Sequence, residues 1–198
     1  MKIGPDSLAF QSSLFEKDDP TLVAAAKQDR AAFGVLYYRY APRVYKYLRA
    51  RLENDDDAAD LTQQVFLQAL AALPKYQSLG APFSAWLFRI AANAITDVRR
   101  RQQAIVGWED IPESQHPPLD QSVEGIVLHH EAILRLQKLL DHLEPSYREV
   151  ILLRFIANLT VREIAEIMGK SEATIYRYLS GALNILKERL GYEAENTA

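Results

Sequence analysis

The chain has four aspartates in one short segment and four histidines spread along its length. These side chains are the first candidates for catalysis or metal binding. They are Asp55, Asp56, Asp57 and Asp60, with His116, His129, His130 and His142. No H-E-x-x-H motif, phosphate-binding loop or nucleophile elbow accompanies them. There are no cysteines, which excludes disulfides, thiol nucleophiles and cysteine-ligated zinc. We therefore predict no enzyme, no metal and no cofactor.

A second group combines an aromatic ring with basic and amide side chains. A helix is predicted over residues 83–102, and five of its residues form one stripe, after a loop that carries two further candidates. The stripe is Trp86, Arg89, Asn93, Thr96 and Arg100, and the loop residues are Tyr76 and Gln77. Aromatic rings beside arginines suit unstacked bases and a phosphate track. The alternative is a buried tryptophan, with arginines that favour the C-terminal end of a helix.

A helix-turn-helix is predicted near the C-terminus. Thr160 and Glu163 form a T-x-x-E capping box, Gly169 ends that helix, and Ser171 begins the next. Two helices joined in this way are typical of a motif that reads duplex DNA in the major groove. An ordinary helical hairpin is the alternative. On the second helix the residues predicted to pack inward are Ile175, Leu179, Ala182, Leu186 and Leu190.

The predicted helix over 56–73 carries a stripe suited to a partner protein. Asp60, Gln63, Gln64 and Leu67 are spaced i, i+3, i+4 and i+7, so they share a face. Polar groups would set the register of a partner helix, and the leucine would anchor it. A solvated face with one exposed leucine is the alternative.

Helical signals position all of these residues, and no strand signal is sustained. Helices are expected at about 21–27, 29–52 (broken or kinked at Pro42), 56–73, 83–102, 131–142, 145–157, 161–168 and 172–190. The net charge of −3 conceals a division: residues 21–102 carry 12 Lys and Arg against 7 Asp and Glu, and residues 103–130 carry none against 5. We expect an all-α chain of two small helical domains, at 21–103 and 131–191. An acidic flexible linker at 104–130 joins them, and tails at 1–20 and 192–198 flank them.

Three segments together resemble bacterial RNA polymerase sigma factors of the sigma-70 family, and most closely the compact extracytoplasmic-function (ECF) group. They are D-A-A-D-L-T-Q-Q-V-F-L-Q-A-L (57–70), P-F-S-A-W-L-F-R-I-A-A-N-A-I-T-D (82–97) and L-T-V-R-E-I-A-E-I-M-G-K-S-E-A-T-I (159–175). The resemblance covers about residues 20–102 and 131–190. It implies a region 2-like domain followed by a region 4-like domain.

The resemblance also implies a role for each segment. The 56–73 stripe would dock on the β′ clamp helices of core RNA polymerase. The loop over 76–82 would hold a flipped non-template base of the −10 promoter element, with the 83–102 stripe along the strand. The −35 element would be read by Ser171, Thr174, Tyr176, Arg177, Ser180 and Gly181. The implied partners are core polymerase (including its β subunit), promoter DNA and an anti-sigma factor. The free protein would be a cytoplasmic monomer without membrane contact.

Two departures from the family pattern keep alternatives open. Gln64 stands where relatives commonly carry Glu, and Arg177 is the only basic residue from Tyr176 to Ile185. A degenerate, inactive relative is therefore one alternative. Another is a free-standing helix-turn-helix regulator that binds palindromic duplex DNA as a dimer.

Overall fold

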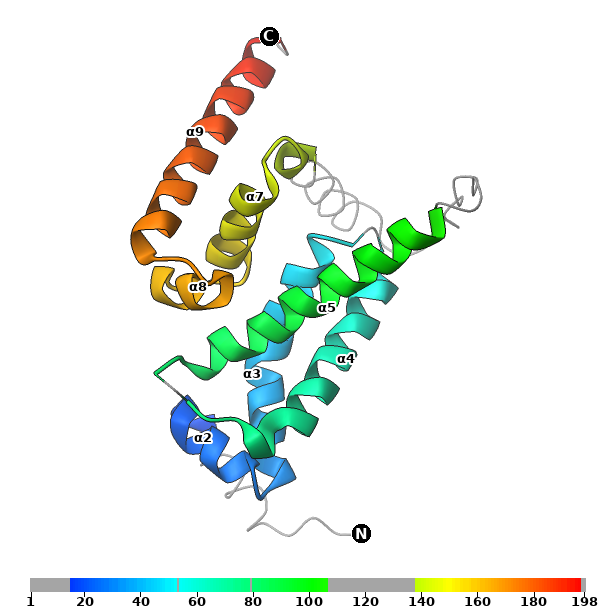
Figure 1. The fold of residues 1–198 in the computed structure, drawn as a ribbon, viewed down its shortest axis with the longest axis vertical. Helices are drawn as coiled ribbons and strands as arrows, with labels where there is room; N and C mark the ends of the chain where they lie inside the picture. Colours follow the sequence, from blue (N-terminus) through cyan, green and yellow to red (C-terminus); the bar gives the residue numbers. More distant parts are fainter. Residues whose placement is uncertain (1–14, 53, 79, 107–137, 197–198) are drawn as a thin grey trace, which may run out of the picture.

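The computed structural model describes residues 15–52, 54–78, 80–106 and 138–196, and these residues form helices without any strand (Figure 1). The first half contains α2 (Asp19–Ala26), α3 (Arg30–Arg49), α4 (Asp55–Ala72), the short 3₁₀ turn η1 (Leu73–Lys75) and α5 (Phe83–Val106). The second half contains α7 (Pro145–Ile151), the π-helical turn η2 (Leu152–Ile156), α8 (Val161–Met168) and α9 (Glu172–Asn196). The all-α prediction is confirmed. Two predicted boundaries differ: residues 104–106 of the predicted linker are helical in α5, and the predicted tail at 192–198 is helical in α9 as far as Asn196. Residues 1–14 of the predicted N-terminal tail and 107–130 of the predicted linker lie outside the described residues.

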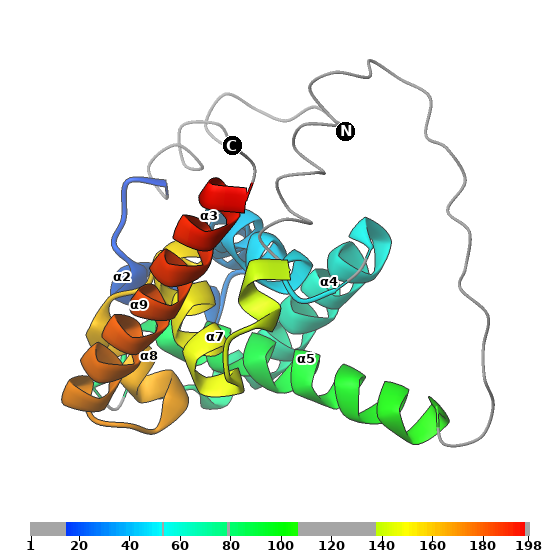
Figure 2. The same cartoon turned by 90° about the horizontal axis from the view of Figure 1, so that it is seen from above.

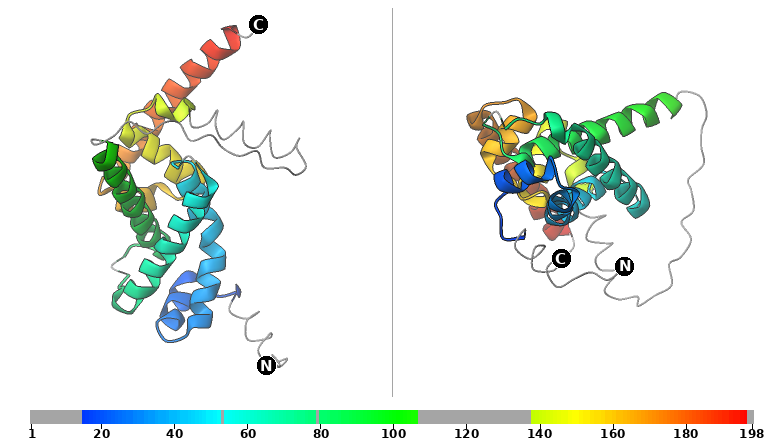
Figure 3. Two further views of the ribbon diagram at one scale, coloured as in Figure 1. Left: turned by 90° about the vertical axis from the view of Figure 1, so that its right-hand side faces the viewer. Right: turned by 90° about the horizontal axis from the view of Figure 1, so that it is seen from below.

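The helices of the first half begin at the polar residues that precede them. The Asp18 carboxylate accepts a hydrogen bond from the Thr21 amide, the Asp29 carboxylate from Ala31, and the Asn54 side chain from Asp57. Helices α3, α4 and α5 then bury their apolar faces against one another, with α2 across one end (Figure 3). The outward face of α4, where one candidate site was predicted, is left to solvent, whereas α8 contacts the N-terminal part of α5.

Pro42 does not break α3, contrary to one form of the prediction. The helix runs unbroken from Arg30 to Arg49 with Pro42 inside it. Pro42 is exposed, so water can satisfy the carbonyl that loses its amide partner there. The chain therefore presents one long helix to its neighbours.

The helix-turn-helix is built as the sequence predicts. The Thr160 side chain and the Glu163 side chain cap each other's backbone amides at the start of α8. Gly169 ends α8 in the left-handed region with φ of 63°, and Ser171 caps the start of α9. Helix α9 then packs along α7 and continues past it (Figure 1).

Two glycines give a matched test of this backbone. Gly169→Ala places a Cβ on a left-handed backbone, so we expect a loss of about 1–2 kcal/mol in the free energy of unfolding. Gly34→Ala, inside α3 with no atom within 4 Å of the added Cβ, should instead gain about 0.5–1 kcal/mol. Urea unfolding of the two variants measures both changes in the free energy of unfolding. A loss at Gly34 as large as that at Gly169 would contradict the assigned conformations.

The second half packs on the first, as the view from above shows (Figure 2). Helix α8 lies against the N-terminal part of α5, and η2 lies against α3. Buried side chains from both halves form one continuous apolar cluster. Helix α9 projects away from this contact (Figure 1).

Candidate nucleic-acid and polymerase interfaces

Helix α4 presents the predicted partner stripe to solvent. Leu61, Val65 and Ala69 are buried on its inner face. Asp60, Gln63, Gln64 and Leu67 are all exposed, and the Leu67 side chain keeps 66% of its surface accessible. An apolar side chain this exposed, inside a polar stripe on a rigid helix, is suited to anchor a partner helix.

The aspartates at the start of α4 have structural partners. The Asp55 carboxylate pairs with Arg49 and accepts a hydrogen bond of 3.2 Å from Tyr45. The Asp57 carboxylate accepts from the Asn54 amide at 2.7 Å. Among the described residues, no three His, Asp or Glu side chains are grouped as metal ligands. Asp55 and Asp57 therefore make structural contacts at the start of α4.

A cavity of about 280 Å³ opens between α2 and the loop before α5. Apolar side chains form much of its wall, and polar groups reach it from both sides. The lining residues are Asp19, Pro20, Val23, Ala24 and Lys27 of α2, with Tyr76, Gln77, Ser78, Pro82 and Phe83. Concave sites with apolar walls and a few polar groups are typical of small-ligand pockets.

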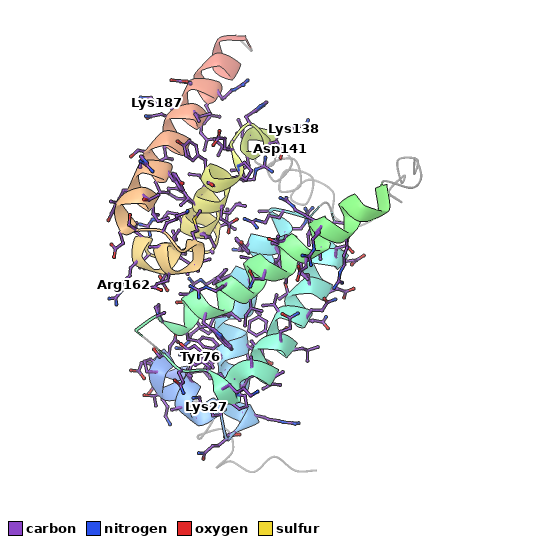
Figure 4. All side chains as sticks on the ribbon, in the orientation of Figure 1. Lys27, Tyr76, Lys138, Asp141, Arg162 and Lys187 are labelled. Carbon is purple, nitrogen blue, oxygen red and sulfur yellow. The ribbon has the colours of Figure 1, made fainter. Side chains whose placement is uncertain are left out.

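Hydrogen bonds between the two sides fix the shape of this cavity. The Lys27 ammonium donates to the Tyr76 carbonyl at 2.6 Å, and Figure 4 shows both residues at the α2 end of the bundle. The Ser78 hydroxyl donates to the Ala81 carbonyl at 3.0 Å. Gly80 takes a positive φ of 86°, which lets the loop turn back toward α5. The cavity is thus preformed in the free protein.

Tyr76 forms a wall of the cavity. Its ring is only 8% exposed and lies 4.6 Å from the Trp86 ring, centroid to centroid. Burial raises the pKa of the Tyr76 phenol. Trp86 is half-buried: its ring packs against the core and keeps one part accessible.

The other residues of the α5 stripe lie on the surface. Asn93 and Arg100 are exposed, and Arg100 pairs with Asp97 at 3.0 Å. Arg89 is exposed too, but its guanidinium donates to the backbone carbonyl of Glu166 in α8. The predicted strand contacts thus lie on the surface of α5, and one of them, Arg89, is already hydrogen-bonded to α8.

Most of the residues at the start of α9 that were predicted to contact the −35 element are exposed to solvent. The Ser171 hydroxyl accepts from the Thr174 amide, and Tyr176, Arg177 and Ser180 are exposed, Tyr176 with 59% of its surface. Gly181 differs, because a Cβ there would lie 2.9 Å from the Tyr147 hydroxyl of α7. Its predicted outward placement is therefore wrong.

Leu190 also differs from its predicted inward placement. Its side chain is 46% exposed, whereas Ile175 and Ala182 are fully buried. The inward placement predicted for Leu190 is therefore wrong.

Several residues of these surfaces carry no local sequence signal. Lys27 reaches the cavity from α2, 49 positions before Tyr76. Arg43 and Tyr47 of α3, and Arg51 just after it, bind the second half of the chain. Only the three-dimensional structure shows that these side chains make these contacts.

Comparison with known proteins assigns both halves of the chain. Residues 36–105 match the family model for sigma-70 region 2, and residues 133–186 match that for sigma-70 region 4. The chain is 36% identical over 160 residues to the ECF RNA polymerase sigma factor BldN of Streptomyces coelicolor, covering 78% of this chain and 59% of that protein. It is 30% identical over 182 residues to the ECF sigma factor SigD of Mycobacterium tuberculosis, covering 88% of this chain and 84% of SigD.

Solved structures have the same fold. The structure of CnrH in complex with the cytosolic domain of CnrY matches with a TM-score of 0.69 at 26% identity, over 88% of this chain and 97% of that one. The sigma factor RpoE of Bartonella quintana, in complex with the anti-sigma factor NepR, matches with a TM-score of 0.61 at 24% identity, over 80% and 96%. The predicted pair of sigma region 2 and region 4 domains is confirmed. The chain belongs to the ECF group of sigma-70 family RNA polymerase sigma factors.

Proposed function

We propose that this sigma factor directs promoter-specific initiation by docking on core RNA polymerase through α4 and by capturing a displaced base of the −10 element in the α2–loop cavity. The cavity is the observation that carries the proposal. It lies at the end of the α5 stripe, where a strand that follows Arg100, Asn93 and Arg89 would arrive.

The cavity has the chemistry to hold a single unpaired base. Proteins that capture flipped bases enclose them between aromatic or apolar walls and read their edges by hydrogen bonds. Phe83, Pro82 and Val23 supply walls, while Lys27, Gln77 and Ser78 supply polar groups. Flipping a base costs a few kcal/mol, and stacking with edge contacts in the cavity offsets that cost.

Melting then follows from binding alone. The duplex opens by fluctuation, and the protein binds the separated strand better than the paired one. Arg89 and Arg100 follow the phosphates, and Trp86 adds a ring for stacking, worth about 1–3 kcal/mol per base. The chain needs no catalytic group of its own, because polymerase supplies the chemistry.

The helix-turn-helix contributes the −35 contacts through Ser171, Thr174, Tyr176, Arg177 and Ser180. Arg177 is the only cation among them, so few phosphates are neutralised there. Affinity for duplex DNA should then fall only gently with salt, by a slope of about −0.9 per neutralised phosphate. The complex with polymerase therefore supplies most of the promoter affinity.

The proposed partners are core polymerase, promoter DNA and an anti-sigma factor. Docking uses Asp60, Gln63, Gln64 and Leu67, all exposed on α4. The structures of CnrH with CnrY and of RpoE with NepR support an anti-sigma partner. No described helix has the length and apolarity needed to span a bilayer. We place the protein in the cytoplasm, where its polymerase and promoters are.

Filling the cavity tests the proposal. Ala24 lines the cavity and is exposed, so Ala24→Trp should block base entry without disturbing the core. With core polymerase on a promoter selected by run-off transcription, we expect permanganate-reactive open complex to form at least about tenfold more slowly, as loss of one stacked base requires. Closed-complex affinity should stay within about twofold, because the duplex does not enter the cavity.

Ala31→Trp is the matched control. Ala31 is exposed at the start of α3 and does not line the cavity. It should leave both steps unchanged. Unimpaired opening by Ala24→Trp would show that the base is held elsewhere.

A further inference from the structure

Helix α2 places one carboxylate in the wall of the base cavity. Asp19 occupies the first turn of α2 and lines the cavity, and its side chain keeps 24% of its surface accessible. Helix α2 precedes residues 36–105, which match the model for region 2. Base contacts were predicted only for the loop over 76–82 and the α5 stripe. Asp19 therefore has no role assigned to it in reading DNA.

Helix α3 holds this carboxylate in one orientation. The Arg39 guanidinium pairs with one oxygen of Asp19 at 2.5 Å, and the Tyr40 hydroxyl donates to the other oxygen. Arg39 also donates to two backbone carbonyls of the segment before α2, at 3.1 and 2.8 Å. The Tyr40 side chain is buried, and its ring lies 5.6 Å from that of Phe83 in the cavity wall. The carboxylate is thus fixed before any base arrives.

The protons of this group are placed so that Asp19 accepts hydrogen bonds. Burial and the hydrogen bond to Asp19 raise the pKa of the Tyr40 phenol, so the hydroxyl keeps its proton and donates it. A carboxylate paired with a guanidinium only accepts, at about four positions on its two oxygens. Arg39 and Tyr40 use two of these positions. Since Asp19 lines the cavity, it can also accept from a donor that enters there.

The other polar side chains of the cavity have different hydrogen-bonding properties. The Lys27 ammonium only donates, and one of its hydrogens goes to the Tyr76 carbonyl (Figure 4). The Gln77 amide and the Ser78 hydroxyl can both donate and accept, so they suit the edge of any base. Among the described residues that line the cavity, Asp19 therefore has the only side chain that accepts without donating.

The four bases differ in what they offer to such a carboxylate. Cytosine, adenine and guanine each carry an exocyclic amino group that donates, and an aspartate is a usual acceptor for the cytosine amino group. Thymine has a carbonyl where cytosine has its amino group, and that carbonyl only accepts. Two acceptors that face each other leave both without a hydrogen bond, which is costly in a site that excludes water. A carboxylate fixed in the cavity wall therefore disfavours thymine.

We propose that Asp19 makes the cavity selective for a base with an exocyclic amino group and makes it reject thymine. The inference rests on the proposed function, because it requires a displaced base of the −10 element to enter the cavity. It assigns part of the promoter specificity to α2, in addition to the loop before α5. Promoters that this protein selects should then carry a base other than thymine at the position that enters the cavity.

The first measurement locates that position. The full-length protein in complex with core polymerase is titrated with the single-stranded non-template −10 strand of a promoter found by run-off transcription. Each base of the strand is replaced in turn by an abasic site. At the cavity position, removal of the base should weaken binding by about tenfold in the unsubstituted protein. It should have no effect with Ala24→Trp, whose indole fills the cavity.

The second measurement isolates the amino group. At the cavity position, cytosine is compared with thymine and with 2-pyrimidinone, which is cytosine without its amino group. We expect the unsubstituted protein to bind the cytosine strand about tenfold more tightly than either of the other two, as loss of a hydrogen bond to a charged group requires. This comparison changes only the DNA, so it does not depend on the folding of any variant.

Asp19→Asn tests the residue itself. The amide has nearly the size of the carboxylate but can both donate and accept, so the preference for cytosine should fall to about threefold or less. Asp18→Asn is the matched control, because it makes the same charge change one residue earlier and does not line the cavity. Asp18 caps α2 by accepting from the Thr21 amide, and Asn caps helices equally well. Asp18→Asn should keep the full preference, and a full preference in Asp19→Asn would overturn the inference.

The inference and the proposed function fail in different ways. If a cavity position is found but cytosine and 2-pyrimidinone bind equally well there, the cavity holds a base that Asp19 does not read. The selectivity is then wrong and base capture stands. If Ala24→Trp alters the effect of no abasic site, the base is held elsewhere and both proposals are wrong. Selected promoters with thymine at the cavity position would also contradict the selectivity.

Discussion

We expect Asp60→Arg to weaken binding to core RNA polymerase strongly and to abolish promoter-specific transcription. Asp60 lies in the α4 stripe, and its side chain is exposed to solvent. A partner surface that complements a carboxylate repels a guanidinium, and such a like-charge contact costs several kcal/mol. We expect affinity to fall by about 100-fold or more, which corresponds to about 3 kcal/mol. Fluorescence anisotropy with labelled protein and core polymerase measures it.

The control for this variant has the same charge change at a remote site. Glu188→Arg lies on the exposed surface of α9, outside the α4 stripe, and should keep its polymerase affinity. The thermal unfolding midpoints of both variants should stay close to that of the parent, because neither carboxylate is buried. If Asp60→Arg still binds polymerase normally, α4 does not form the docking surface.

Trp86→Ala should have the second large effect, on promoter opening. The Trp86 ring lies 4.6 Å from Tyr76 and 5.5 Å from Phe83, between the base cavity and the α5 stripe. Removing it takes away a stacking surface worth about 1–3 kcal/mol, so opening should slow by about 5- to 150-fold. Closed-complex affinity should change by less than about threefold, since paired bases cannot stack on the ring. Rapid mixing with a fluorescent base analogue in the −10 strand separates the two steps.

Trp86 also packs against the core, so its variants need a stability control. Trp86→Phe keeps an aromatic face and should recover most of the opening rate. Assays at a temperature where both variants are folded remove the contribution of unfolding. Equal losses in the closed and open steps would assign Trp86 a structural role only.

The sequence predicted the elements well because their signals are local. Apolar side chains at helical spacing placed α4 and α5, and the pair Thr160 and Glu163 marked the first residue of α8. Gly169 marked its end, since a left-handed residue is needed there. The faces predicted on α4 and most of those on α9 followed from the same periodicity. The exact domain boundaries, at 21–103 and 131–191, stay predictions.

What the sequence did not predict depends on contacts between distant segments. Gly181 was expected to contact the −35 element, but α7 approaches that point of α9 with Tyr147. Leu190 was predicted to pack inward, but its side chain is exposed. The cavity needs Lys27 from α2, and no spacing rule links Lys27 to Tyr76. Likewise, nothing in the α5 sequence indicates that α8 would cover Arg89.

The modest charge of the reading helix bears on the remaining alternatives. A free-standing regulator would have to bind duplex DNA through α9, where Arg177 is the only basic residue among the proposed contacts. A sigma factor that acts in a complex with polymerase needs less affinity for duplex DNA of its own. A degenerate, inactive relative would keep this fold but would fail to dock on polymerase or to open the promoter.

Run-off transcription tests the central claim most directly. Purified core polymerase is given genomic fragments with and without this protein, and transcripts are sequenced. We predict discrete new start sites that appear only with the protein, disappear with Asp60→Arg and persist with Glu188→Arg. Identical transcripts in the presence and absence of the protein would contradict the account.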